Sequence, residues 1–300
     1  MNHIAANDGI ESIAHALLQP GSCGGVSVRT ALFEQIIDGL SVLITRHREP
    51  QTEILRFPPV MSRQQLEKSG YLHSFPHLLG CVSCLQGDES DVRASVEGSD
   101  HNWVAALSAT ELVLTPAACY PLYPIVAARD HVPGEGLLFD VASYCFRREA
   151  THEVDRLQAF RMREYVCVGT SEQALDFRTR WISRAKELAT RLGLTSRIAP
   201  ASDPFFGRAG RLAAMIQVQQ SLKFELLIPV HSQEQPTACM SFNYHRDYFG
   251  KTWGLRSDAG DTAHTACVAF GLDRLALALF GTYGLDLQRW PAAVCEALSV

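Results

Sequence analysis

The segment from Cys145 to Val166, CFRREATHEVDRLQAFRMREYV, constrains the fold more than any other part of the sequence. Two stretches rich in aromatic and aliphatic residues flank the short segment ATHEVD, a pattern typical of two antiparallel strands joined as a hairpin. The segment also contains five arginines and four acidic residues. A hairpin with this much charge is either solvated and held by cross-strand ion pairs or turned toward a polar ligand. The residues alone leave both interpretations open.

Side chains alternate along a strand, so Arg156, Phe160 and Glu164 are expected to share one face. Arg147 and Glu149 have the same relation in the preceding strand. Arginine forks bind phosphate oxygens through paired hydrogen bonds, and an aromatic ring can stack on a purine. A carboxylate can accept a hydrogen bond from the exocyclic amine of adenine. These five side chains would therefore suit an ATP site.

Apolar periodicity predicts the other elements. An amphipathic helix is expected over 29–48, followed by a strand that ends at the prolines 58 and 59. Further strands are expected at 111–116, 136–149, 156–170, 222–230, 237–244 and 264–271. Helices are expected from Thr170 or Ser171 to about Gly193, from Asp203 onward and over 272–280, with Leu212, Met215 and Ile216 facing inward in the second. Neighbouring pairs of strands favour an α+β class, a central antiparallel sheet flanked by helices.

Composition excludes several classes of protein. The chain has 300 residues, 47% of them hydrophobic and 20% charged, an ordinary globular composition that allows one large domain or two smaller ones. The net charge of −5 gives no overall basic field, so the whole chain does not resemble a nucleic-acid binder. No secretory signal and no run of about 18 apolar residues is present, so we expect a cytoplasmic protein with no membrane contact.

The nine cysteines do not suggest disulfides, because the number is odd and no export signal is visible. Cys81 and Cys84 form the only CxxC pair. A structural zinc site would need a second close pair, which does not follow, so these two are expected to be small buried residues.

Several segments together resemble the class II aminoacyl-tRNA synthetases. FRRE (146–149) followed by RLQAFRMRE (156–164) resembles their motif 2, nearest to the seryl enzymes. AFGLDRLALALF (269–280) resembles motif 3, although Gly271 is the only one of its usual glycines, and 29–59 resembles motif 1. LTPAAC (114–119) resembles the LxPTxE segment of seryl enzymes, with Ala117 and Cys119 replacing threonine and glutamate. The order and separations fit from about residue 29 to 285, so the resemblance implies a single class II synthetase-like catalytic domain over 1–300.

The resemblance implies a role for each charged residue. Arg147 would bind the α-phosphate of ATP, Glu149 would accept a hydrogen bond from the adenine amine, and Phe160 would stack on adenine. Arg156 and Arg274 would hold the γ-phosphate, with Arg147 and Arg274 steadying charge during catalysis. An amino-acid carboxylate would attack the α-phosphate of Mg²⁺-bound ATP to give an aminoacyl-adenylate. No Mg²⁺ ligand can be assigned.

The resemblance also implies a zinc site. Seryl-type enzymes of some methane-producing archaea hold zinc through Cys, Glu and Cys, and Cys119, Glu164 and Cys267 match those positions. Three protein ligands and one open position are typical of catalytic zinc. The open position would take the neutral amine of the substrate. Sequence spacing alone indicates only buried thiols at Cys119 and Cys267.

Departures from the seryl pattern argue against tRNA. Only 28 residues precede the motif 1 helix, where seryl enzymes carry a tRNA-binding domain, and the hairpin loop is short. Both features match the bacterial amino acid:[carrier protein] ligases, truncated homologues that pass a small amino acid, glycine or alanine, to the phosphopantetheine thiol of a carrier protein. A homodimer through motif 1 is implied. The alternatives are a tRNA-acting paralogue and a non-catalytic regulatory paralogue.

The segment from about 171 to 220, expected as a helical insert between motifs 2 and 3, is basic. It contains eight basic and four acidic residues. Carrier proteins are generally acidic, so this insert is a candidate docking site, with Arg208 and Arg211 as the expected contacts. The alternative is an ordinary solvated helix face.

Overall fold

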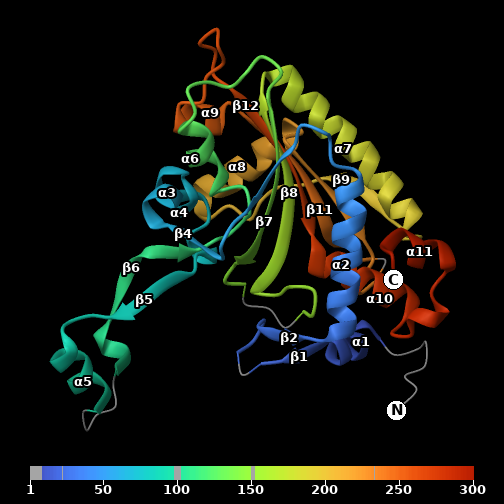
Figure 1. Ribbon diagram of the computed structural model, residues 1–300, viewed down its shortest axis with the longest axis horizontal. Helices are drawn as coiled ribbons and strands as arrows, with labels where there is room; N and C mark the ends of the chain where they lie inside the picture. Colours follow the sequence, from blue (N-terminus) through green and yellow to red (C-terminus); the bar gives the residue numbers. More distant parts are fainter. Residues whose placement is uncertain (1–8, 22, 98–102, 150–152, 233) are drawn as a thin grey trace.

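The structure is a computed structural model that describes residues 9–21, 23–97, 103–149, 153–232 and 234–300 (Figure 1). A central seven-stranded sheet has the order β3-β7-β8-β12-β11-β10-β9. The bounds are β3 (Glu53–Arg56), β7 (Leu137–Phe146), β8 (Ala159–Gly169), β9 (Arg197–Pro200), β10 (Lys223–Ile228), β11 (Thr237–Arg246) and β12 (His264–Gly271). The hairpin predicted within 145–166 corresponds to β7–β8, although residues 150–152 of its loop lie outside the described ranges.

The expected α+β class with a central sheet flanked by helices is confirmed, with one correction. Neighbouring strands are antiparallel except β3 and β7, which pair in parallel. A parallel pair needs a long crossover connection, and here the chain from Arg56 to Leu137 supplies it. The sequence shows strand-forming segments in neighbouring pairs but does not show that this edge strand is reached by a crossover.

One face of the sheet is covered by α1 (Ile10–Leu17), α2 (Ala31–Arg46), α7 (Ser171–Arg191), α10 (Leu272–Tyr283) and α11 (Ala292–Leu298), which share one apolar core with it. The helix expected over 29–48 is α2, and Thr30 caps it by accepting from the amide of Phe33. Thr170 and Gln173 form a capping box at the start of α7. α7 buries Phe177 and Trp181 against the sheet, so this first part of the basic segment 171–220 belongs to the main core.

The opposite face carries α6 (Leu122–Ala127) and α9 (Tyr248–Trp253), packed on β7, β8 and β12 in a second apolar cluster. A separate three-stranded sheet has the order β4-β6-β5. Its elements are β4 (Val60–Ser62), β5 (Cys81–Leu85) and β6 (Leu107–Leu114), with α3 (Arg63–Lys68), α4 (Tyr71–Ser74) and the short η1 (Pro76–Leu78). Elsewhere lie β1 (Leu18–Pro20), β2 (Ser27–Arg29), α5 (Glu89–Glu97), η2 (Trp103–Ala106), α8 (Gly207–Gln219) and η3 (Leu287–Arg289).

Two sequence expectations about burial are wrong. Cys81 and Cys84 are exposed, because β5 belongs to a hairpin that extends with α5 away from the main sheet (Figure 1). On α8, Leu212, Met215 and Ile216 are exposed, and Gly210 is its only buried residue. No element packs over this apolar face of α8 in the described part of the chain. Among the described helices, none is long and apolar enough to cross a membrane.

Candidate active site

A cavity of about 530 Å³ opens beside the central sheet. Its wall combines β8, β11 and β12 with the segment after β7, the segment before α6, and residues of α4 and α8. The side chains of Arg147, Glu149, Phe160 and Arg274 line it. Residues of the hairpin and of the motif 3 segment thus line one cavity.

Arg147 lies just after β7 rather than on it. Its amide donates to the carbonyl of Gln158 at 2.9 Å, and its Nε donates to the carbonyl of Pro116 at 3.0 Å. Its guanidinium lies 5.4 Å from the centre of the Phe160 ring, a cation–π distance. Burial alone would lower the pKa of Arg147, but neighbouring acidic groups, Tyr71 first, raise it above its ordinary value. The side chain is therefore a fixed positive charge on the cavity wall.

Arg274, in the first turn of α10, is fixed in a similar way. Its Nε donates to the carbonyl of Asp155 at 2.8 Å, and its Nη1 donates to the carbonyl of Ala238 at 3.0 Å. The Asp155 carboxylate is bonded to His231 Nε2 at 2.9 Å and to the Thr237 hydroxyl at 2.5 Å. Burial raises the pKa of Asp155, but these hydrogen bonds and the charge of Arg274 outweigh it and hold the pKa below its ordinary value.

Arg156 does not join this group. It precedes β8, and its side chain is 51% exposed. It pairs with Glu153 at 2.7 Å and with Glu149 at 3.5 Å, and it is not among the residues that line the cavity. The expectation that it shares a strand face with Phe160 and Glu164 is wrong, because the strand begins only at Ala159.

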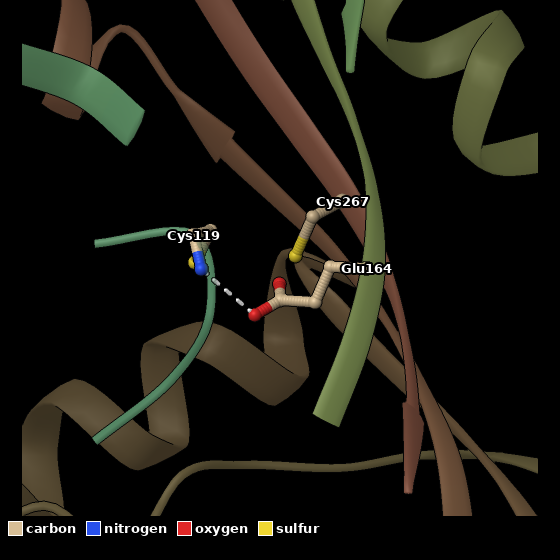
Figure 2. A group of neighbouring side chains, drawn as sticks. All are labelled: Cys119, Glu164 and Cys267. Carbon is tan, nitrogen blue, oxygen red and sulfur yellow. Dashed lines mark hydrogen bonds between the residues drawn. The ribbon is translucent and has the colours of Figure 1, made fainter. Parts of the chain in front are cut away.

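Cys119, Glu164 and Cys267 come together in the wall of the cavity, although they arise from three separate segments (Figure 2). Their ligand atoms all lie within 4.8 Å of one another, and all three residues are buried. The backbone amide of Cys119 donates to Glu164 Oε1 at 3.0 Å. Glu164 and Cys267 come from the adjacent strands β8 and β12, so the hydrogen-bonded ladder fixes their relation.

The electrostatics of this cluster fit a bound cation. Burial, followed by the nearby Cys267, raises the pKa of Glu164 well above its ordinary value. A hydrogen bond with Cys119 is the main cause that lowers the pKa of Cys267, and the same contact raises the pKa of Cys119. No ion pair neutralises any of the three within the described ranges. Two thiols and a carboxylate form the kind of donor set that holds a divalent metal such as zinc.

Sequence reasoning missed several polar residues of the cavity. Asn243 Nδ2 lies 3.3 Å from Cys267 Sγ, and His245 Nε2 lies 3.8 Å from the same sulfur. The alternating polar residues of SFNYH on β11 are a signal that would have found this pair. Lys223, paired with Asp203 at 2.6 Å, also lines the cavity, but no local pattern links those two positions.

Arg208 and Arg211 lie on the exposed surface of α8 and do not line the cavity. α8 itself borders the cavity, because its residues Ala213, Ile216 and Gln217 form part of the wall. The two arginines are therefore near the rim of the cavity but outside it.

The comparisons with known proteins decide the family. The chain is 58% identical, over 98% of its length, to amino acid–[acyl-carrier-protein] ligase 1 of Bradyrhizobium diazoefficiens and covers 90% of that protein. It is 56% identical to ligase 2 of the same organism, over 98% of the chain and 88% of the relative. The chain belongs to the amino acid–[acyl-carrier-protein] ligase family.

This ligase chain is more distantly similar to the type-2 serine–tRNA ligase of Methanopyrus kandleri, with 25% identity over 89% of the chain. It spans only about half of that protein, 54% of its length. A crystal structure of the M. kandleri seryl enzyme with a tRNA from A. aeolicus superposes with a TM-score of 0.83, 21% identity and coverage of 100% of this chain and 62% of the other. The expected class II seryl-type fold is confirmed. No profile of a protein family matches the chain.

Proposed function

We propose that this protein activates a small amino acid, glycine or alanine, with ATP and transfers it to the phosphopantetheine thiol of a carrier protein. The family supports ligation to a carrier. The observation that carries the proposal is the composition of the cavity wall, since one cavity contains both the arginine–phenylalanine–glutamate set and the Cys119–Glu164–Cys267 cluster. A nucleotide on the first set and an amino acid at the second would be neighbours.

The first step joins a carboxylate oxygen of the amino acid to the α-phosphorus of ATP, and the bond to the pyrophosphate breaks. Charge develops on the α-phosphate oxygens during this attack. Arg147 and Arg274 are held by backbone carbonyls before substrate arrives, so little reorganisation is needed to stabilise that charge. In the second step the carrier thiol forms a thioester with the acyl carbon, and AMP leaves.

Phe160 and Glu149 would select the nucleotide. The ring of Phe160 offers a stacking surface for adenine. The Glu149 carboxylate can accept a hydrogen bond from the exocyclic amine of adenine. Mg²⁺ would enter with ATP. Lys223 lies in the same wall, but it is neutralised by Asp203 and Glu225 at 2.6 and 3.1 Å.

Zinc held by Cys119, Glu164 and Cys267 would bind the neutral amine of the amino acid in its open position. The three side chains would orient that amine, while burial excludes competing water. A small amino acid would fit because the buried residues Ala117 and Ala269 line the same cavity, and Ala269 is paired directly with Glu164.

The exposed surface of α8 is the proposed carrier dock. Arg208 and Arg211 present positive charge beside the exposed apolar side chains of Leu212 and Met215, and the helix borders the cavity. An acidic carrier bound there would have its prosthetic arm directed at the cavity. We further propose a cytosolic homodimer through α2 and β3, where Val42 and Ile54 are 44% and 48% exposed.

ATP–pyrophosphate exchange across the twenty amino acids tests the activation step, with the zinc content of the same sample recorded. Transfer is then compared between phosphopantetheinylated carrier, the same carrier lacking its prosthetic group, and tRNA. Exchange with glycine or alanine and transfer only to the prosthetic group would support the proposal. Specific acylation of tRNA would favour the tRNA-acting alternative, and absence of exchange with every amino acid would favour the regulatory one.

A further inference from the structure

The environment of Cys267 differs from that of Cys119. Cys267 Sγ has two side-chain nitrogen atoms beside it, Asn243 Nδ2 at 3.3 Å and His245 Nε2 at 3.8 Å. For Cys119 Sγ, the hydrogen bonds found within the described residues include no side-chain nitrogen donor. Two chemically identical ligands of one cluster thus have unequal surroundings.

The backbone explains why Asn243 lies beside the sulfur. Asn243 on β11 is paired directly with Cys267 on β12, so the two side chains leave the sheet on the same face. Asn243 Nδ2 is also 3.3 Å from the Ser241 hydroxyl, two residues earlier on that face. The amide is therefore held with its nitrogen toward the sulfur.

His245 reaches the sulfur through an irregularity. The pairing of β11 with β12 shifts between Tyr244 and Arg246, and Arg246 adopts a positive φ of 56°. A bulge of this kind turns the extra residue's side chain away from its regular direction. Here the extra residue is His245, and its ring contacts both Thr265 and Cys267.

Thr265 contacts the other ring nitrogen of His245. Its Oγ1 lies 3.0 Å from His245 Nδ1, and Thr265 is fully buried. A metal-bound thiolate has no proton to donate, so the only hydrogen bond possible at Nε2 is one in which Nε2–H is the donor. Nδ1 is then unprotonated and accepts from the Thr265 hydroxyl. This contact orients the ring, and the hydroxyl can donate to Nδ1 when Nε2–H donates to sulfur.

We propose that Asn243 and His245 are positioning residues that donate two hydrogen bonds to the Cys267 thiolate and so orient this ligand and tune its electron donation to the metal. Hydrogen bonds to a coordinating sulfur lower the energy of its lone pairs, and groups that support ligands commonly strengthen metal binding. This inference rests on the zinc site of the proposed function. Neither residue ligates the metal in this proposal.

The test uses the full protein loaded with cobalt(II), whose sulfur-to-metal charge-transfer band reports on the thiolates. Asn243→Leu and His245→Leu remove a donor with little change of volume, and His245→Gln restores an N–H. His264→Gln is the matched control, because His264 bonds Tyr244 instead of the cluster. Zinc affinity is measured alongside by competition with a chromophoric chelator.

Both leucine variants should move the charge-transfer band to lower energy and weaken zinc binding by about 10–100-fold. His245→Gln and His264→Gln should keep the wild-type band. An unshifted band in both leucine variants overturns the inference while leaving the metal site intact. Absence of a thiolate band in cobalt-loaded wild-type protein overturns the inference together with the metal site, so the two failures can be told apart.

Discussion

Replacing Arg147 with alanine tests the assignment of the α-phosphate site most directly. The guanidinium is held by Pro116 and lies against Phe160, so it is oriented before substrate binds. Removing one preorganised donor to a developing charge costs about 2.7–4 kcal/mol, a loss of roughly 10²–10³ in rate. The variant also leaves the buried carbonyl of Pro116 without this donor, which costs about 1–3 kcal/mol of stability.

These two effects are separated by measuring them independently. ATP–pyrophosphate exchange reports the rate of adenylate formation, and thermal unfolding reports the stability of the same sample. Arg148→Ala is the matched control, since Arg148 is exposed and does not line the cavity. Exchange should fall by about 10²–10³ in Arg147→Ala and change little in Arg148→Ala. Near-normal exchange by Arg147→Ala, measured below its unfolding temperature, would refute the assignment.

Three further results are expected. Cys119→Ala and Cys267→Ala should each lower zinc from about one per chain to a trace by elemental analysis, and unchanged content in both would remove the metal site. Arg208→Glu with Arg211→Glu should raise the KM for the carrier by about tenfold at low salt, and less at high salt, without altering pyrophosphate exchange; a salt-independent or absent effect would contradict docking on α8. Because the pKa of Asp155 lies below its ordinary value of 3.8, its ionised form stabilises the fold above that pH, and this stabilisation is lost as pH falls through the lowered pKa. Asp155→Asn should therefore be less stable at neutral pH and show a flatter acid dependence in denaturant titrations; an unchanged acid dependence would contradict it.

The regular parts of the fold could be predicted because their signals are local. The apolar spacing of α2 and the capping box at Thr170 are contained in a few consecutive residues. The exposure of the apolar residues of α8 could not be predicted in the same way. Its apolar residues Leu212, Met215 and Ile216 have helical spacing, but only the assembled fold shows that no described element covers them. Periodicity identifies an apolar face without identifying what packs on it.

In the candidate site, too, some features follow from local sequence and others do not. Alternation along β8 alone places Phe160 and Glu164 on one face of the strand. Cys119 and Cys267 come from distant segments, and only the family resemblance joined them to Glu164. The bulge that turns His245 toward Cys267 depends on pairing between strands, which no single segment encodes.

The register of β8 links the two halves of the site. Phe160 and Glu164 are four residues apart on one strand face, a separation of about 13 Å at 3.3 Å per residue. That separation is compatible with the proposed aminoacyl-adenylate, which would place adenine on the ring and the amine beside the carboxylate. A one-residue slip of β8 against β7 and β12 would turn both side chains to the opposite face at once. Two arginines of this strand also resist such a slip, since Arg161 forms an ion pair with Asp273 and Arg163 forms one with the buried Asp140. The charges that make the hairpin sequence unusual therefore include residues that fix its register as well as those that face the cavity.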